Sequence, residues 1–261
     1  MYQLDYFVTT HPLGESVTIT DVTFKKGCPI IEESQQLKFA VGIANMGYDV
    51  TIKECKEVID QVKDLHGELF NYEEECTIAT GSLRRKAQWL NRYPHHKVVG
   101  LRGNVNTRLQ SLADSDWQGA IFAKAGLERI DLLPENYQDL HWMIPAPAQG
   151  AMVIAVMDND VFCKEACAKL NDADAALTTK VEREFLRKLE GGCTAPIGAI
   201  AKIEDDHIHF HGALFSLDGT QKLEIKESIP VSECLDFGAL CALKILEEGG
   251  RELMEAIKKE L

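Results

Sequence analysis

The fold of this chain is decided by the segment Cys76-Thr77-Ile78-Ala79-Thr80-Gly81-Ser82-Leu83-Arg84-Arg85-Lys86-Ala87-Gln88-Trp89-Leu90. Its first four residues are typical of a strand, Thr80-Gly81-Ser82 of a turn, and the remainder of a helix. The same pattern continues downstream, with strands predicted at 97–101 and 119–123 and a helix at 105–112, and the last strand runs into Ala125-Gly126-Leu127-Glu128-Arg129. Strands and helices that alternate at short spacing predict a parallel sheet covered by helices, which binds ligands beyond the carboxyl ends of its strands.

Arginines gather at that edge of the predicted sheet. Arg84 and Arg85 lie in the first turn of one helix and Arg108 in the first turn of the next, while Arg102 ends the strand between them. A cation in a first turn opposes the helix dipole, at about 0.3–1 kcal/mol each, so the repetition indicates a bound anion. Helix N–H groups and the hydroxyl of Ser82 would assist, and arginine favours bidentate carboxylate or phosphate recognition. The alternative is a solvated basic face that contributes only to solubility.

A second informative segment is Ile144-Pro145-Ala146-Pro147-Ala148-Gln149-Gly150, which continues into an apolar run ending at Val156. The two prolines keep its first part extended, and the apolar run predicts a buried strand. A proline-containing segment between two patterned regions is also typical of an interdomain crossing. Gly150 would serve close packing or let the backbone approach a ligand.

The third segment is Leu189-Glu190-Gly191-Gly192-Cys193-Thr194-Ala195-Pro196, which follows a run of helical periodicity from Thr179. The two glycines are predicted to end that helix, and Pro196 prevents it from resuming. Cys193 therefore lies on a short loop. It is either a small buried apolar residue or a thiol presented to a cleft for covalent chemistry, and the spacing alone favours neither interpretation.

Composition excludes several classes of protein. The formal net charge of −13 argues against nucleic acid as the main partner, because phosphate binding needs a basic face. We find no membrane span and no secretory signal, so we expect a cytoplasmic protein. Its eight cysteines form no C-x-x-C pair, which favours reduced thiols over a disulfide framework or a zinc site. His207, His209 and His211 alternate on a predicted strand, where an exposed polar face is favoured over a metal site.

The two ends of the chain are predicted to be separate α/β and α+β regions. Near the N-terminus, strands are expected at 17–24 and 48–52 and helices at 31–46 and 55–65, without a catalytic constellation. From about residue 163 a small α+β unit is expected, with strands at 199–203, 208–215 and 222–225 and a helix at 235–261 that is interrupted near Gly249-Gly250.

Four segments together resemble the porphobilinogen deaminase (hydroxymethylbilane synthase) family: Thr80–Arg85, Leu101–Leu109, Pro147–Ala151 and Leu189–Pro196. The resemblance runs from about Cys76 to about Leu223, with a shortened or divergent N-terminal domain. It implies α/β domains of the periplasmic-binding-protein type around a cleft. The expected domains are an incomplete first domain (1–70 plus 144–162), a second, parallel-sheet α/β domain with an arginine-lined cleft (71–143), and a small C-terminal α+β domain with the cofactor cysteine (163–261).

The resemblance also implies roles for individual residues. Cys193 is expected to carry a dipyrromethane cofactor through a thioether, and Ser82, Arg84 and Arg85 to hold its acetate and propionate groups. Arg102, Arg108 and Arg129 are expected on the side of the substrate and the growing chain, and Gln149 and Gly150 in the wall of the cleft. No metal site is expected.

The implied function is a transferase of tetrapyrrole and heme biosynthesis that joins four porphobilinogen units head to tail and releases ammonia. Porphobilinogen carries two carboxylates, which arginines can neutralise. The expected partner is this small molecule, with no nucleic acid or membrane, and the family suggests a monomer, although association is possible. The family's His-Ser-x-Lys-Asp-x-Pro segment is absent from the sequence, so no catalytic aspartate is assigned. The alternatives are a family member that binds pyrrole polycarboxylates or other small anions without turnover, and a general anion-binding domain with Cys193 unmodified.

Overall fold

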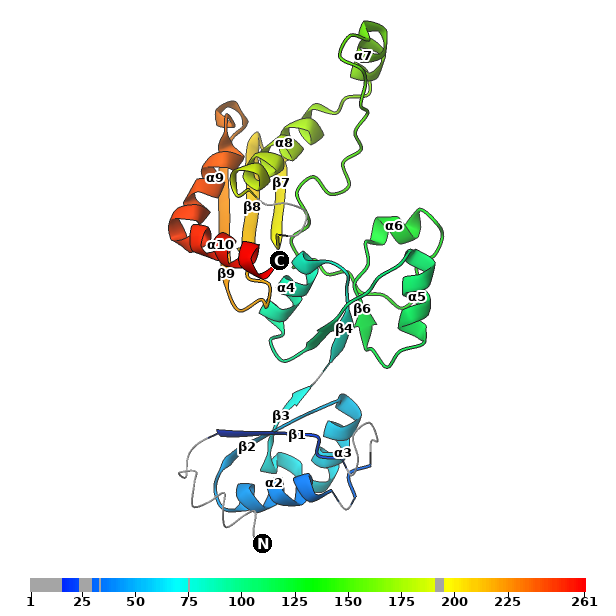
Figure 1. Cartoon of the computed structure of the whole chain (residues 1–261), viewed down its shortest axis with the longest axis vertical. Coiled ribbons are helices and arrows are strands. Elements are labelled where there is room, and N and C mark those ends of the chain that lie inside the picture. The colour runs from blue at the N-terminus through cyan, green and yellow to red at the C-terminus, as the bar shows by residue number, and fades with distance from the viewer. Residues whose placement is uncertain (1–15, 24–29, 33, 75, 191–194) are drawn as a thin grey trace. The chain divides into compact units, whose positions relative to one another are not determined.

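The computed structural model of the chain describes residues 16–23, 30–32, 34–74, 76–190 and 195–261. The chain divides into two compact units. The first comprises residues 1–78, 95–97 and 115–119, and the second comprises 79–94, 98–114 and 120–261. Figure 1 shows the elements of both units along the chain.

The first unit contains a three-stranded sheet in the order β1-β2-β3, with all strands parallel. Its elements are β1 (Ser16–Thr20), α2 (Gln35–Asn45), β2 (Asp49–Glu54), α3 (Lys56–His66), the 3₁₀ turn η1 (Gly67–Leu69) and β3 (Asn71–Glu74). α2 begins where the hydroxyl of Ser34 accepts the N–H of Leu37 at 3.1 Å, which is a typical N-cap. The strands and helices predicted for this part of the sequence are confirmed, and β1 is shorter than predicted.

The second sheet has the strand order β5-β4-β6. The chain runs through β4 (Thr77–Ala79), α4 (Leu83–Arg92), β5 (Lys97–Val99), α5 (Val105–Ala113), β6 (Gly119–Ala120) and α6 (Lys124–Glu128). The N–H of Lys97 donates to Cys76 O and the N–H of Thr80 to Val99 O, both at 2.9 Å. Because the two bonds advance together along both strands, the pairing is parallel, as the alternating pattern predicts.

The C-terminal part of the second unit is an antiparallel sheet of β7 (Ile197–Glu204), β8 (His207–Phe215) and β9 (Lys222–Pro230). Its helices are α7 (Val161–Ala168), α8 (Ala173–Lys188), α9 (Phe237–Ile245) and α10 (Arg251–Glu260), with the short turns η2 (Val231–Glu233) and η3 (Leu246–Gly250). Figure 1 shows α8, α9 and α10 on one face of this sheet. There Phe210 packs between Phe185 and Phe237, with ring centroids 5.1 and 6.0 Å apart.

The register of β8 separates a buried face from a polar one. Ile208 and Phe210 are buried in the core under the helices, while His207 and His209 are exposed and His211 is partly exposed. The predicted polar face is thereby confirmed. Among the described residues, no group of His, Cys, Asp and Glu side chains could hold a metal ion.

Two local predictions are wrong. Residues 150–156 form no regular structure, and Met152 and Val153 are 90% and 86% exposed, so the expected buried strand is absent. Within the described chain no strand pairs with this segment, and an apolar run without a partner strand cannot satisfy its backbone as a sheet. In addition, the left-handed residue that follows α8 is Glu190 (φ 54°), two positions after the last helical residue, Lys188. Gly191 and Gly192, expected to end the helix, lie outside the described residues.

The structure is thus a mixed α/β fold with parallel sheets, while the predicted boundaries at 1–70, 71–143, 144–162 and 163–261 stay predictions. In the described part of the chain, no helix has the length and apolar character to cross a bilayer. The cysteines that the structure describes are all free thiols.

Candidate functional site

The turn between β4 and α4 places the first arginines. Ser82 caps α4, since its hydroxyl accepts the N–H of Arg85 at 3.4 Å, and its own N–H donates to the hydroxyl of Thr80 at 3.3 Å. Gly81 packs so closely on the carbonyl oxygen of Leu101 that any Cβ at this position would collide with it. Only glycine allows this approach, which brings the turn next to the segment that carries Arg102.

The side chains of Arg84 and Arg85 are oriented by neutral backbone oxygens. Arg84 Nη1 donates to Ile144 O at 2.5 Å and Nη2 to Gln149 Oε1 at 3.2 Å. Arg85 Nη1 donates to Ile121 O, directly after β6, at 3.1 Å. These bonds fix the positions of both guanidinium groups without neutralising their charge.

Arg108 completes a cluster of three cations. α5 is capped by Asn104, whose side chain accepts the N–H of Thr107 at 2.9 Å, and Arg108 Nε donates to Gly103 O at 2.8 Å. We call Arg84, Arg85 and Arg108 the arginine cluster. In the part of the chain that the structure describes, none of the three pairs with a carboxylate.

Burial and mutual repulsion lower the pKa values in this cluster. Burial, followed by the charge of Arg85, lowers the pKa of Arg84 to about 10. Burial and the charge of Arg108 also lower the pKa of Arg85. Three neighbouring cations without a counter-ion are energetically unfavourable, so a bound anion would be stabilised here.

Two predicted residues of the cleft wall lie on a tight turn beside Arg84. Gln149 Oε1 accepts from Arg84 and also from the N–H of Ala146 at 3.2 Å. Gly150 has φ +91°, and nothing lies within 4 Å of the position that its Cβ would occupy. Close packing therefore does not explain this glycine, whereas its backbone conformation does.

Glu182 of α8 holds this turn in place, a role that the sequence pattern did not predict. Its carboxylate is buried and accepts the N–H of Ala148 at 2.5 Å and of Ala201 at 2.8 Å. Burial raises the pKa of Glu182, and the two N–H bonds only partly offset this effect. The available signal was a carboxylate within the apolar stripe of α8, between Val181 and Phe185. Glu182 is thus a positioning residue that joins the Gln149 turn to β7.

Gln88 is a second residue whose positioning role the sequence pattern did not predict. It is buried, its Nε2 donates to Ile144 O at 2.9 Å, and its Oε1 accepts the N–H of Ile144 at 2.7 Å. Ile144 O therefore accepts from both Gln88 and Arg84, which lie four residues apart on one face of α4. That spacing was the sequence signal.

The remaining predicted residues are not joined to the arginine cluster. Arg102 and Arg129 are exposed, and neither is among the charges that shift the pKa values of Arg84 and Arg85. Cys193 lies outside the described residues. The flanks of its loop belong to the second unit, where Leu189 is buried in the core and Pro196 O accepts the N–H of Phe215 at 3.1 Å.

The sequence matches two family models. Residues 47–165 match the model described as "Porphobilinogen deaminase, dipyromethane cofactor binding domain". Residues 176–247 match the model described as "Porphobilinogen deaminase, C-terminal domain". The two matches cover the arginine cluster and both sides of the Cys193 loop.

Curated proteins with similar sequences carry the same name. Porphobilinogen deaminase of Thermus thermophilus is 38% identical over 186 residues, which cover 70% of this chain and 62% of that protein. The porphobilinogen deaminase of Syntrophotalea carbinolica is 35% identical over 182 residues, 69% of this chain and 58% of the relative. A probable porphobilinogen deaminase of Methanococcoides burtonii is 30% identical over 238 residues, 88% of this chain and 72% of the relative.

The match to the first two relatives spans about three fifths of their length. The match to the third extends over most of this chain at 30% identity. Together with the two family models, these similarities show that the chain belongs to the porphobilinogen deaminase family.

Proposed function

We propose that this chain takes up a dipyrromethane cofactor at Cys193 and condenses porphobilinogen units into hydroxymethylbilane on it. The observation that carries the proposal is the arginine cluster, whose three guanidinium groups are oriented by backbone oxygens and, within the described residues, unpaired with carboxylates. Such donors fit the acetate and propionate groups of a pyrrole chain, because guanidinium binds carboxylate in a bidentate manner.

The residues divide into those that hold the cofactor and those that receive the substrate. Arg84 and Arg85, with the Ser82 turn, bind the carboxylates of the cofactor, while Gln149 and Gly150 form the wall beside them. Arg102, Arg108 and Arg129 act on the side of the incoming unit and the growing chain. When bound, the cofactor supplies a free pyrrole position for coupling, and its thioether serves as a permanent anchor. No aspartate of the chain is assigned to proton transfer.

The finer architecture belongs to the same proposal. Residues 71–143 form the arginine-bearing domain of periplasmic-binding-protein type, residues 1–70 with 144–162 form an incomplete first domain, and residues 163–261 carry the cofactor cysteine. We expect the protein to act on this small molecule in the cytoplasm, where thiols stay reduced. The free thiols of the described cysteines agree with this setting.

Intact mass spectrometry tests the proposal. The purified chain, incubated with porphobilinogen, should gain the mass of two pyrrole units, and ammonia and hydroxymethylbilane should accumulate. Cys193→Ala should gain no mass. Cys167→Ala, which removes another free thiol, is the matched control and should be modified like the unsubstituted chain.

The outcomes separate cofactor attachment from turnover. A chain that never gains mass, or that gains it equally in Cys193→Ala, contradicts the assignment of the cofactor site. A chain that gains two pyrrole units but releases no further ammonia would be a binding protein without turnover. Thermal unfolding of each variant shows whether a loss of modification reflects a loss of fold.

A further inference from the structure

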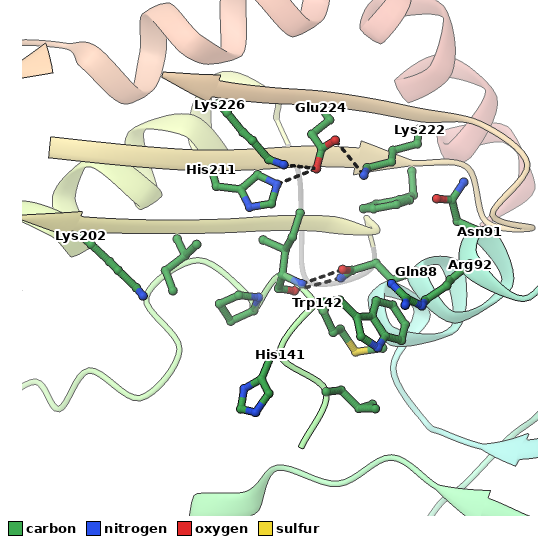
Figure 2. Close-up of a pocket in the computed structure, with 16 residues that line it drawn as sticks. Gln88, Asn91, Arg92, His141, Trp142, Lys202, His211, Lys222, Glu224 and Lys226 are labelled. Carbon is green, nitrogen blue, oxygen red and sulfur yellow. Dashed lines mark hydrogen bonds and ion pairs between the residues drawn. The ribbon is translucent and has the colours of Figure 1, made fainter. Parts of the chain in front are cut away.

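A cavity of ≈ 750 Å³ lies in the second unit, on the face of the C-terminal sheet opposite its helices (Figure 2). It is bounded by the end of α4, by residues 140–145 and by that sheet face. In the register, Ile200 pairs with His211 and His211 with Lys226, while Phe215 pairs with Lys222. Paired residues share a face, so the same alternation that buries Phe210 under the helices turns these side chains into the cavity.

The charges that line this cavity are mostly positive. Its cations are Arg92, Lys202, Lys222 and Lys226, its histidines are His141 and His211, and its one lining carboxylate among the described residues is Glu224. With one acid against four cations, the cavity is strongly basic in a chain whose formal net charge is −13. A basic hollow in an acidic molecule creates a local positive potential that attracts anions to that place.

Glu224 neutralises only one side of the cavity. Its Oε2 lies 2.9 Å from Lys222 Nζ, and its Oε1 lies 2.7 Å from His211 Nε2 and 3.7 Å from Lys226 Nζ. Lys202 and Arg92, labelled in Figure 2, have no carboxylate partner among the described residues. The uncompensated charge is therefore concentrated on the α4 and β7 sides.

Hydrogen bonds and a cation–π contact connect the walls of the cavity independently of any ligand. Asn91 Nδ2 of α4 donates to Gly219 O in the turn between β8 and β9 at 2.8 Å. Gln88 bonds both polar backbone atoms of Ile144, and Arg92 lies 4.9 Å from the ring centroid of Trp142. Since these contacts already order the backbone of the walls and Arg92, the conformational entropy lost on binding would be mainly that of the Lys202 and Lys226 side chains.

We propose that this cavity binds a small polyvalent oxyanion, a polycarboxylate or a polyphosphate, through Arg92, Lys202 and Lys226, at a site separate from the arginine cluster. The two sites lie at opposite ends of α4, since eight residues from Arg84 to Arg92 span roughly 12 Å of helix. The proposal does not depend on cofactor capture or on turnover.

Calorimetric titration of the full chain tests the cavity directly. Inorganic pyrophosphate and tricarballylate serve as separate probes, and the ratio of their affinities shows which source of oxyanion the cavity prefers. All titrations use an Arg85→Ala background, which weakens the arginine cluster. We expect saturable binding of at least one probe with one site per chain, weakened as salt screens the charges.

Two variants of the cavity, one with two substitutions and one with a single substitution, should change the affinity in opposite directions. Lys202→Met with Lys226→Met should weaken binding by roughly tenfold or more, as for the loss of charge-assisted contacts. The matched control, Lys169→Met with Lys188→Met, removes the same charge from exposed positions directly after α7 and at the end of α8, and should change affinity by less than about twofold. Glu224→Gln removes the internal competitor and should strengthen binding by roughly threefold or more.

Three outcomes would overturn the proposal. They are no saturable binding of either probe in the Arg85→Ala background, an equal loss in both lysine pairs, and an unchanged or weaker affinity in Glu224→Gln. Thermal unfolding shows whether each variant is folded. Because Glu224→Gln is expected to gain affinity, a folding defect in the lysine variant does not remove the test.

Discussion

The second unit holds two basic regions that differ in whether their cations pair with a carboxylate of the described chain. In the arginine cluster, each guanidinium donates to backbone carbonyl oxygens at 121, 144 and 103, which orient it and leave its charge intact. In the cavity of the C-terminal sheet, Glu224 accepts hydrogen bonds from Lys222 and His211, so its carboxylate occupies the position that a bound anion would take. Among the described residues, the first region therefore has no carboxylate that would compete with an anion, whereas an anion in the second region would compete with Glu224.

The pKa values of Arg84 and Glu224 reflect the same difference in charge pairing between the two regions. Arg84 has a pKa lowered to about 10, because burial and Arg85 disfavour its charged form. Partial burial acts to raise the pKa of Glu224, but hydrogen bonds from Lys222 and His211, with the charges of Lys222 and Lys226, lower it to about 2. The charged form of Arg84 is therefore disfavoured where no carboxylate pairs with it among the described residues, whereas the ion pairs of Glu224 favour the charged form of that group.

The largest effect is expected where one residue supports both regions. Glu182→Ala removes the carboxylate that accepts the N–H groups of Ala148 and Ala201. Ala148 lies beside the arginine cluster, and Ala201 lies beside the cavity wall. Leaving two such donors unsatisfied should lower the free energy of unfolding by roughly 2–4 kcal/mol. Chemical denaturation measures the change. Glu184→Ala, on the same helix and without a backbone N–H partner, should cost less than about 1 kcal/mol, and equal losses would contradict this role for Glu182.

The second prediction compares the two ends of α4. Arg85→Ala should reduce capture of the two-pyrrole adduct by roughly 10- to 100-fold, because a charge-assisted contact to a carboxylate is lost. Arg92→Ala removes the same side chain from the cavity end and should leave capture within about twofold. Quantitative intact mass over time gives both rates. Similar losses in both variants would mean that the two basic regions form a single site.

The third prediction concerns acid stability. Because the pKa of Glu224 is lowered from 4.5 to about 2, its ion pairs contribute stability above pH 4.5, and this contribution is lost as the pH falls toward 2. The group is partly exposed, so we expect a contribution of only about 1 kcal/mol. Glu224→Gln should lack this component when unfolding is followed between pH 5 and 2.5. Parallel curves for the two chains would show that the ion pairs add nothing to stability.

The smallest effect is expected at Ala148, which has φ 59° in the turn beside the arginine cluster. The left-handed conformation costs an alanine roughly 1–2 kcal/mol, while glycine adds roughly 0.4–1 kcal/mol of unfolded-state entropy. Ala148→Gly should therefore stabilise the chain by about 0.5–1 kcal/mol. Ala166→Gly, inside α7, should instead destabilise it by about 1 kcal/mol, and thermal unfolding compares the two signs.

Local pattern predicted most of the secondary structure. The strand and helix of the segment from Cys76 to Leu90 and the alternating histidines of β8 were predicted, because each depends on neighbouring residues in the chain. The apolar run from Gly150 to Val156 shows the limit of this approach. Its composition favours a strand, yet a strand forms only beside a partner, and the described chain supplies none there.

The positions of Glu182 and Gln88 show what local pattern left undecided. Both are polar residues on helices, and the residues next to them in the sequence do not indicate that Ala148, Ala201 or Ile144 are their hydrogen-bond partners. The same holds for Arg85, since its acceptor lies 36 residues away in the chain. Contacts of this range depend on how elements pack, which no periodicity encodes.

The sequence by itself determined most of the segments that become helices and strands, which of them carry the arginines, and which family the four motifs resemble. Only the tertiary structure decided that Arg84, Arg85 and Arg108 come together without a carboxylate among the described residues, while Lys222 and Lys226 share Glu224. The physical reason is that helix and strand periodicity depends on neighbouring residues, whereas the counter-ion of a charge is chosen by packing between segments far apart in the chain.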